Sequence, residues 1–195
     1  MPLGTLSPRS PLRLLQHAAL LVATAVPVGV LVGQTLEETN EQIATLKNVF
    51  VGLEHYSSKD YVQAIKPFRL AAEQGDATAQ FYLGVMYDNG EGVPQDYAEA
   101  VKWYRLAAEQ GYASAQFNLG VMYNAGQGVP QDYARAHKWL NLAASRASAE
   151  KNKKYGAARD QVAEKMTAAQ IAEAQRLARE WKPKTWEELK GQVTQ

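Results

Sequence analysis

The sequence predicts an all-α protein in which helix–loop–helix units stack as a solenoid. The first observation is a repeat, because residues 81–116 and 117–152 align without gaps and share 21 of 36 positions. The second is that apolar residues recur at helical intervals on both sides of a loop that contains glycine and proline. Strand signals, by contrast, are absent. A fixed period of this length is typical of stacked supersecondary units.

The first 33 residues have the pattern of an export signal. Arg9 and Arg13 precede an apolar run of 16 residues, 18–33, which ends in small residues. This order is typical of a secretory signal peptide, and cleavage fits after Ala25 or after Gly33. The run contains a proline and is short for a membrane span of about 20 residues. We expect a periplasmic or secreted protein; the alternative is an uncleaved anchor that leaves the chain membrane-attached and facing the periplasm.

Composition excludes several classes of function. The chain has 195 residues, 21 Lys and Arg, and 20 Asp and Glu, so it offers no strong field for nucleic acid. Loss of residues 1–33 would leave 19 basic and 20 acidic residues, a net charge of −1. The sequence contains no cysteine, which excludes disulfides, thiolate metal sites and cysteine nucleophiles. We therefore expect no nucleic-acid partner, and contact with a membrane only through an uncleaved N-terminal segment.

The elements follow in order. A linker (34–40) leads into a repeat domain (41–181), whose first helix is expected at about residues 41–56. The units span 41–80, 81–116 and 117–152. The first unit is a diverged repeat that lacks the glycine-rich loop, although residues 60–80 match residues 96–116. A helical cap (153–181), with Thr167 starting its last helix, closes the array, and a loosely attached tail (182–195) follows.

The loop of each full unit, "NGEGVPQD" at residues 89–96, contains its own start and stop signals. Gly90 is expected to end the preceding helix in the left-handed conformation. Pro94 cannot continue a helix interior. Asp96 is expected to cap the next helix.

The repeated residues resemble a known family. Leu83, Gly84 and Tyr87, followed by Ala100 and Tyr104, match the tetratricopeptide skeleton. The longer period and the "GxGVPQDY" loop are similar to its Sel-one-like branch. The resemblance implies a right-handed α/α superhelix that acts as an adaptor for other proteins. It also marks a departure, because many secreted members pin each unit with a disulfide and this chain has no cysteine.

A search for catalytic chemistry finds little. The glycines lack the pattern of a phosphate loop, and no twelve-residue calcium loop is present. Ser148 and Lys151 match S-x-x-K, but the companion motifs of penicillin-recognising enzymes are missing, so Ser148 is expected to begin a helix. We predict a non-catalytic protein with no cofactor, metal site or catalytic residue. A cell-wall-directed or β-lactamase-like envelope enzyme is the alternative.

A protein or peptide partner is expected on one side of the first helix of each unit. Helical winding places Leu83 toward the core and a second stripe on the other side. The resemblance implies that this stripe lines a concave groove. The candidate partner-binding residues are Thr78, Tyr82, Val85, Asn89, Ser114, Asn118, Val121 and Ala125. Differences between the copies along the stripe fit either partner recognition or exposed drift. Truncation of Tyr82 is expected to leave stability nearly unchanged, and Trp103 and Trp139 are expected to pack between helices.

Overall fold

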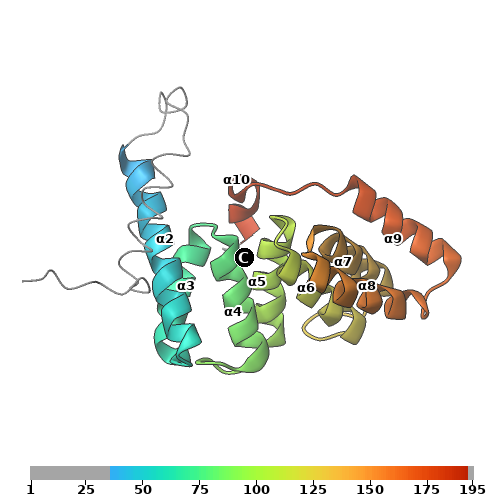
Figure 1. The fold of residues 1–195 in the computed structure, drawn as a ribbon, viewed down its shortest axis with the longest axis horizontal. Coiled ribbons are helices and arrows are strands. Elements are labelled where there is room, and N and C mark those ends of the chain that lie inside the picture. Colours follow the sequence, from blue (N-terminus) through green and yellow to red (C-terminus); the bar gives the residue numbers. More distant parts are fainter. Residues whose placement is uncertain (1–35, 193–195) are drawn as a thin grey trace, which may run out of the picture. The chain divides into compact units, whose positions relative to one another are not determined.

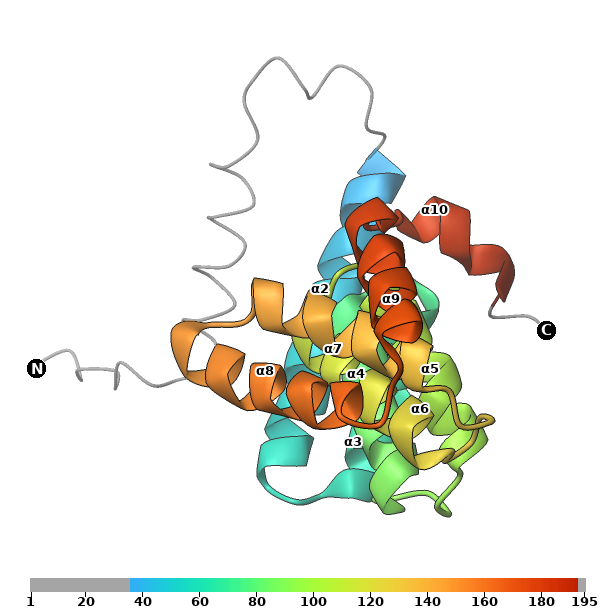
Figure 2. The same cartoon turned by 90° about the vertical axis from the view of Figure 1, so that its right-hand side faces the viewer.

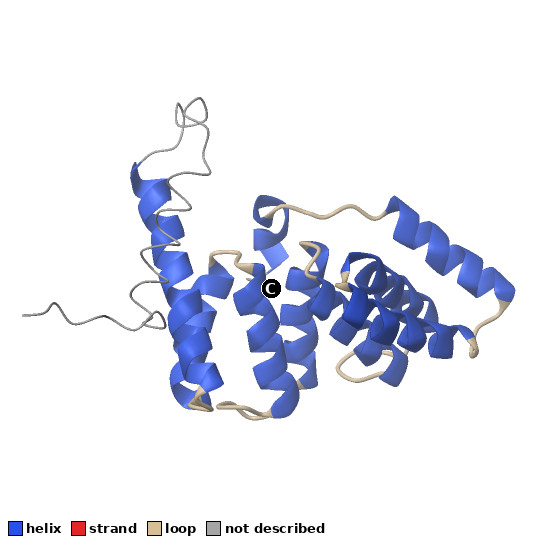
Figure 3. Ribbon diagram, viewed as in Figure 1, coloured by secondary structure: helices blue, strands red, loops and turns tan. Residues whose placement is uncertain are grey.

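A computed structural model describes residues 36–192, and helices are its only regular elements within that range (Figure 1, Figure 3). This confirms the all-α class. The helices are α2 (Leu36–Ser57), α3 (Tyr61–Glu73), α4 (Ala77–Asn89), α5 (Tyr97–Glu109), α6 (Ala113–Ala125), α7 (Tyr133–Arg146), α8 (Ala149–Ala163), α9 (Ala168–Glu180), α10 (Trp186–Leu189) and the 3-10 turn η1 (Lys190–Gln192). The expected export signal, residues 1–33, lies outside the described residues. No described helix combines the length and apolarity that a membrane crossing requires.

The chain divides into two compact units, Met1–Lys47 and Asn48–Gln195, and α2 crosses the boundary. The described part of the first unit is the beginning of α2, which includes residues 36–40 that the sequence assigned to a linker. In it the Thr45 hydroxyl donates to the carbonyl of Glu41, and the side chain of Ile43 is 51% exposed. All contacts discussed below lie within the second unit.

The second unit is a stack in which each helix from α3 to α8 packs against the next, and α9 returns to pack against α7 (Figure 2). Of the four residues that helical winding assigns to the core side of α4, Ala79, Leu83 and Met86 are fully buried and Tyr87 is half-buried. Corresponding side chains of α6 are buried as well. Burial between consecutive helices gives apolar clusters that follow one another along the stack, and repeat proteins are stabilised by such contacts between neighbours. The solenoid expected from the period is therefore the observed architecture.

The loops confirm their predicted signals. Gly90 ends α4 with φ 72°, a left-handed conformation that residues with a Cβ rarely adopt. The carboxylate of Asp96 then accepts hydrogen bonds from the first amides of α5. Asp132 caps α7 in the same way. Each long loop thus ends one helix and begins the next with local chemistry alone.

A repeated side-chain amide hydrogen bond joins α4 to α3 and α6 to α5, the helices on either side of each short turn. The side-chain amide of Gln80 donates to the carbonyl of Ala72, at 3.1 Å. Gln116 makes the same bond to Ala108 at 3.0 Å, one period later. These carbonyls lie at helix ends, where four acceptors have no partner within the helix. Gln80 and Gln116 are fully buried, so the bond satisfies polar groups inside the core.

The cap continues this pattern beyond the recognisable repeats. Asn152 of α8 donates to the carbonyl of Ala144 at 2.7 Å, so α8 occupies the place of a further first helix. Thr167 caps α9 through a reciprocal bond with Gln170, as the sequence predicted.

The described part of the tail, residues 182–192, is not loosely attached, which corrects the prediction for these residues; the last three lie outside the described range. Leu189 is fully buried, and Trp186 packs against the same apolar cluster as Phe68 and Leu106. The backbone amide of Lys184 donates to the carbonyl of Glu109 at 2.8 Å. The prediction failed because the tail has no helical period, and its apolar side chains contact residues far away in the sequence.

Candidate protein-binding surface

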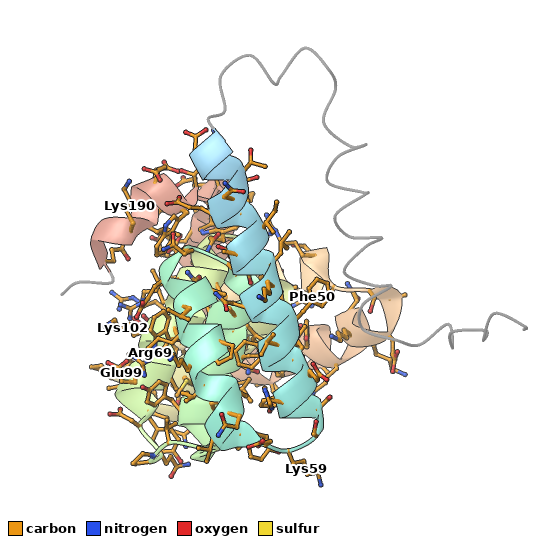
Figure 4. All side chains as sticks on the ribbon, turned by 90° about the vertical axis from the view of Figure 1, so that its left-hand side faces the viewer. Phe50, Lys59, Arg69, Glu99, Lys102 and Lys190 are labelled. Carbon is orange, nitrogen blue, oxygen red and sulfur yellow. The ribbon has the colours of Figure 1, made fainter. Side chains whose placement is uncertain are left out.

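A glycine in the first helix of each unit sets the register of that helix. Each packs directly against a large side chain of the second helix, leaving no room for a Cβ. The three pairs are Gly52–Phe68, Gly84–Tyr104 and Gly120–Leu140. The residues two positions before these glycines are Phe50, Tyr82 and Asn118, so Phe50 extends the predicted stripe into the first unit. Figure 4 shows Phe50 on one side of the array and Arg69, Glu99 and Lys102 on the other.

The predicted stripe lies on one face of α4 and α6, and its members differ in exposure. Asn89 and Ala125 are exposed at the helix ends, and the side chain of Val121 is 38% exposed. The remaining five are half-buried: Thr78, Tyr82, Val85, Ser114 and Asn118. We call the face that these eight residues and Phe50 share the inner face. The structure therefore places the predicted residues on the two first helices α4 and α6, partly covered by neighbouring side chains.

Tyr82 is held in place by other aromatic rings. Its ring lies parallel to that of Phe68, with centroids 5.0 Å apart and an interplanar angle of 2°. Tyr56 meets it edge-on at 4.9 Å. Pairs of this kind stabilise by about 0.5–1.5 kcal/mol beyond the area they bury. The expectation that truncating Tyr82 leaves stability unchanged is therefore wrong, because the preceding unit covers one side of the ring.

The polar members of the inner face are partnered by tyrosine hydroxyls. Ser114 lies 3.3 Å from the hydroxyl of Tyr155. The hydroxyls of Tyr112 and Tyr104 lie near Thr78 and Asn118 respectively. Burial raises the pKa of the Tyr112 hydroxyl, so it stays protonated across the neutral range. The contact between Ser114 and Tyr155 restricts both side chains, which lowers the entropy cost of binding a ligand against them.

A row of rings beside the predicted stripe was missed by the sequence analysis. Phe81 lies 5.1 Å from Tyr112, centroid to centroid. Phe117, its equivalent one period later, stacks on Tyr155 at 4.3 Å, and the ammonium of Lys154 lies 5.1 Å from the Phe117 ring. The two phenylalanines recur at the same repeat position, a signal that was present in the alignment. Their partners, Tyr112 and Tyr155, do not recur, and no sequence signal pairs them.

Two carboxylates accompany the rings at the loop end of α4. The hydroxyl of Tyr56 donates to the carboxylate of Glu91 at 2.8 Å, and that of Tyr104 to Asp88 at 3.2 Å. Burial raises the pKa of the Asp88 carboxyl above its ordinary value, and the bond from Tyr104 partly offsets this. The inner face thus combines half-buried rings with a few fixed polar groups. Such a surface binds by aromatic contact and directed hydrogen bonds.

The residues weighed for catalysis do not assemble into a reactive site in the described part of the chain. Ser148 and Lys151 are both exposed around the start of α8. Among residues 36–192, no three His, Asp or Glu side chains converge as metal ligands would. His137 is 3% exposed and replaces Val101 of the preceding copy, inside the helix packing.

Comparisons with known proteins agree with this architecture. The Sel1 repeat family model matches residues 50–76, 77–112 and 113–148. A search of curated protein sequences gives no match.

Two similar solved structures come from bacteria. One is c5321, a protective antigen present in uropathogenic Escherichia coli strains and described as displaying an SLR fold; its TM-score is 0.66 at 25% identity, over 95% of this chain and 44% of that one. The other is a Sel1 repeat protein from Oxalobacter formigenes, with a TM-score of 0.50 at 40% identity, over 54% of this chain and 43% of that one. The chain thus spans less than half the length of either protein. With three matched units covering half of its sequence, the chain belongs to the Sel1 repeat family.

Proposed function

We propose that this protein is an exported, non-catalytic scaffold that binds a protein or peptide on its inner face. Sel1 repeat proteins generally serve as protein-interaction scaffolds and are typically non-enzymatic. The observation that carries the proposal is the inner face together with the row of rings beside it, where aromatic rings and hydrogen-bonded polar groups follow one another along consecutive helices. Aromatic side chains of this kind often dominate the free energy of binding.

Differences between the copies support recognition of a non-repetitive partner. Thr78, Tyr82 and Asn89 become Ser114, Asn118 and Ala125 one period later, whereas the core stripe is nearly unchanged. An extended ligand meets a different side chain at each unit, so such variation lets the face read its sequence. Exposed drift gives the same pattern, and binding measurements with single variants separate the two.

One matched pair of substitutions tests the inner face. Val121→Lys places a charge on an exposed inner-face position of α6, and Val62→Lys places the same charge on α3, where the side chain is 66% exposed. Both variants should fold, because neither side chain is buried. Affinity capture from the envelope fraction should recover the same partner with wild type and with Val62→Lys, and lose it with Val121→Lys. Equal recovery by all three proteins would contradict binding at this face.

Export is proposed from residues 1–33 alone. A basic start followed by a short apolar run is the pattern that secretion systems recognise. The mature protein should begin between Val26 and Thr35 and occur in a periplasmic or secreted pool. The intact mass of the native protein tests this. A mass that includes the N-terminal residues, in a membrane fraction, would establish the anchored form instead.

A further inference from the structure

The C-terminal residues 181–189, here called the strap, lie along the edge of the array that contains the short turns between units. Figure 1 shows the extended part of the strap returning from the end of α9 toward α5, with α10 at its end. The residues between its two tryptophans, 182–185, are exposed, whereas Leu189 is fully buried. The strap is therefore held by the apolar side chains near its ends and, between them, by the contacts of Lys184 with Glu109.

The two tryptophans of the strap occupy equivalent places on consecutive units. Trp186 lies over Gly75, where a Cβ would stand 2.5 Å from its Cδ2 atom. Trp181 lies over Gly111, the same position one period later, with its ring centroid 6.2 Å from that of Trp139. Trp103, the equivalent of Trp139, belongs to the buried cluster that holds Trp186 and Leu189. We call Gly75, Trp103, Glu109, Gly111 and Trp139 the outer track.

The spacing of the strap matches the period of the array. Packed helices lie about 8–10 Å apart, so equivalent helices of consecutive units are separated by about 16–20 Å. Five residues of extended chain, the separation of Trp181 and Trp186, reach about 16–18 Å. An extended peptide with a tryptophan at every fifth residue can therefore place one ring on each unit. The outer track is a repeated site that reads such a peptide in register.

Glu109 supplies the polar part of the track. Its carboxylate accepts a hydrogen bond from the Trp181 indole at 3.1 Å and lies 3.4 Å from the ammonium of Lys184. Its backbone carbonyl accepts from the Lys184 amide. The Glu109 side chain is only 14% exposed, so these interactions are sheltered from solvent. Aromatic anchors, a backbone hydrogen bond and a charge pair are together the means by which proteins bind extended peptides.

Arg146 lies beside the outer track and contacts the strap. Gln110 donates to both the Gly75 carbonyl and the side-chain oxygen of Gln80. Arg146 stands one period after Gln110, but its guanidinium lies over the Trp181 ring at 4.5 Å. The corresponding side-chain oxygen of Gln116 is buried without a hydrogen-bond partner. Arg146 thus contacts the strap, whereas its equivalent Gln110 bonds to the core residue Gln80.

We propose that the strap is a displaceable internal ligand and that the outer track is a second docking site, distinct from the inner face. Its partner is a protein segment that is extended between two tryptophans five residues apart, with a basic residue between them and a leucine in a helical turn after the second. While the strap is in place, the track is closed to that partner. Displacement couples binding of the partner to release of the C-terminus.

The test uses the full chain and a fluorescent synthetic peptide of residues 180–192. Trp186→Ala combined with Leu189→Ala removes the two anchors at the end of the strap and leaves the track intact. A tethered ligand competes at a high effective concentration. We call this double substitution the unlatched variant. In fluorescence anisotropy, the peptide should therefore bind it at least about tenfold more tightly than it binds wild type. A peptide in which both tryptophans are alanine should not bind either protein.

A charge reversal on the track provides the matched control. Adding Glu109→Lys to the unlatched variant should weaken peptide binding at least about tenfold, because it opposes Lys184 and removes the indole acceptor. Glu73→Lys, the same change at the exposed equivalent one unit earlier, should leave binding unchanged. If the unlatched variant fails to fold, the single substitution Lys184→Glu, at an exposed position, replaces it. The Lys184→Glu protein should still bind the peptide more tightly than wild type does.

Three results would overturn the proposal. The first is an unlatched variant that melts cooperatively but does not bind the peptide. The second is equal binding by wild type and unlatched chain, because the strap would then not close the track. The third is a wild-type dimer that exchanges labelled straps between copies, which would assign the track to a second copy of this chain.

Discussion

A single methyl group at Gly84 is expected to destabilise the array, although alanine is the better helix former. In an exposed helix interior, replacing glycine with alanine stabilises by about 1 kcal/mol. Within α4, however, the new Cβ would stand 2.5 Å from Cδ1 and 2.6 Å from Cε1 of Tyr104. Carbon atoms do not approach so closely, so either the ring or the helix must move.

The ring has little room to move. Tyr104 is 1% exposed, and its hydroxyl donates a hydrogen bond to the carboxylate of Asp88. Overpacking a core costs about 1–3 kcal/mol, and a pinned ring places Gly84→Ala near the upper end. After the helix-propensity gain of about 1 kcal/mol, the net loss is about 2 kcal/mol. For a domain of this size, that loss lowers Tm by roughly 4–8 °C.

Gly156→Ala is the matched control, because it makes the same change inside α8 with no atom within 4 Å of the new Cβ. It should stabilise by about 0.5–1 kcal/mol and raise Tm slightly. Thermal melts followed by circular dichroism, with urea titrations to obtain free energies, measure both variants. A Gly84→Ala protein as stable as wild type would refute the proposed close packing. Changes in Tm of the same sign for Gly84→Ala and Gly156→Ala would also refute it.

Three further predictions follow from local geometry. Gly90→Val should lower the free energy of unfolding by about 1–2 kcal/mol, because φ at this position is 72°; an unchanged urea midpoint would contradict the loop geometry. Tyr82→Ala should cost about 1–2 kcal/mol through loss of the stack on Phe68, and a wild-type Tm would show that this stack contributes nothing. Burial, with a smaller contribution from Arg159, lowers the pKa of His137 below its ordinary value. The unfolded state then gains its proton first as pH falls through about 6.5, so stability is lost on acidification. The drop in Tm between about pH 8 and about pH 5.5 should be larger for wild type than for His137→Val; equal drops would remove His137 as the cause.

Local chemistry made much of the fold predictable from the sequence. Gly90 and Asp96 act on their own neighbours in the chain, so their roles as helix end and helix cap follow from residue type and spacing. The core stripe of Leu83 and Met86 follows from helical winding for the same reason. The repeat then required that the same pair of helices recur and stack.

The candidate site was only partly predictable. Winding correctly placed Tyr82 on a different side of α4 from Leu83, but it did not reveal that Phe68 of the preceding unit covers one side of the ring. The pairing of Phe117 with Tyr155 joins residues in different repeats, and neither composition nor period indicates it. Periodicity assigns a residue to a face of its helix; the residue that the face meets depends on how helices pack.

By itself, then, the sequence determined an all-α array of stacked helix–loop–helix units, their loops and most of their core, because these features depend on contacts within one unit and its copies. Only the tertiary structure decided the position of the strap. The Trp181 indole reaches Glu109 across 72 residues, from a segment with no helical period and no repeat. Its apolar side chains pack where the outer sides of Trp103 and Trp139 remain uncovered after the units have stacked. That surface exists only once the array has formed, so no local sequence pattern predicts which segment of the chain will pack on it.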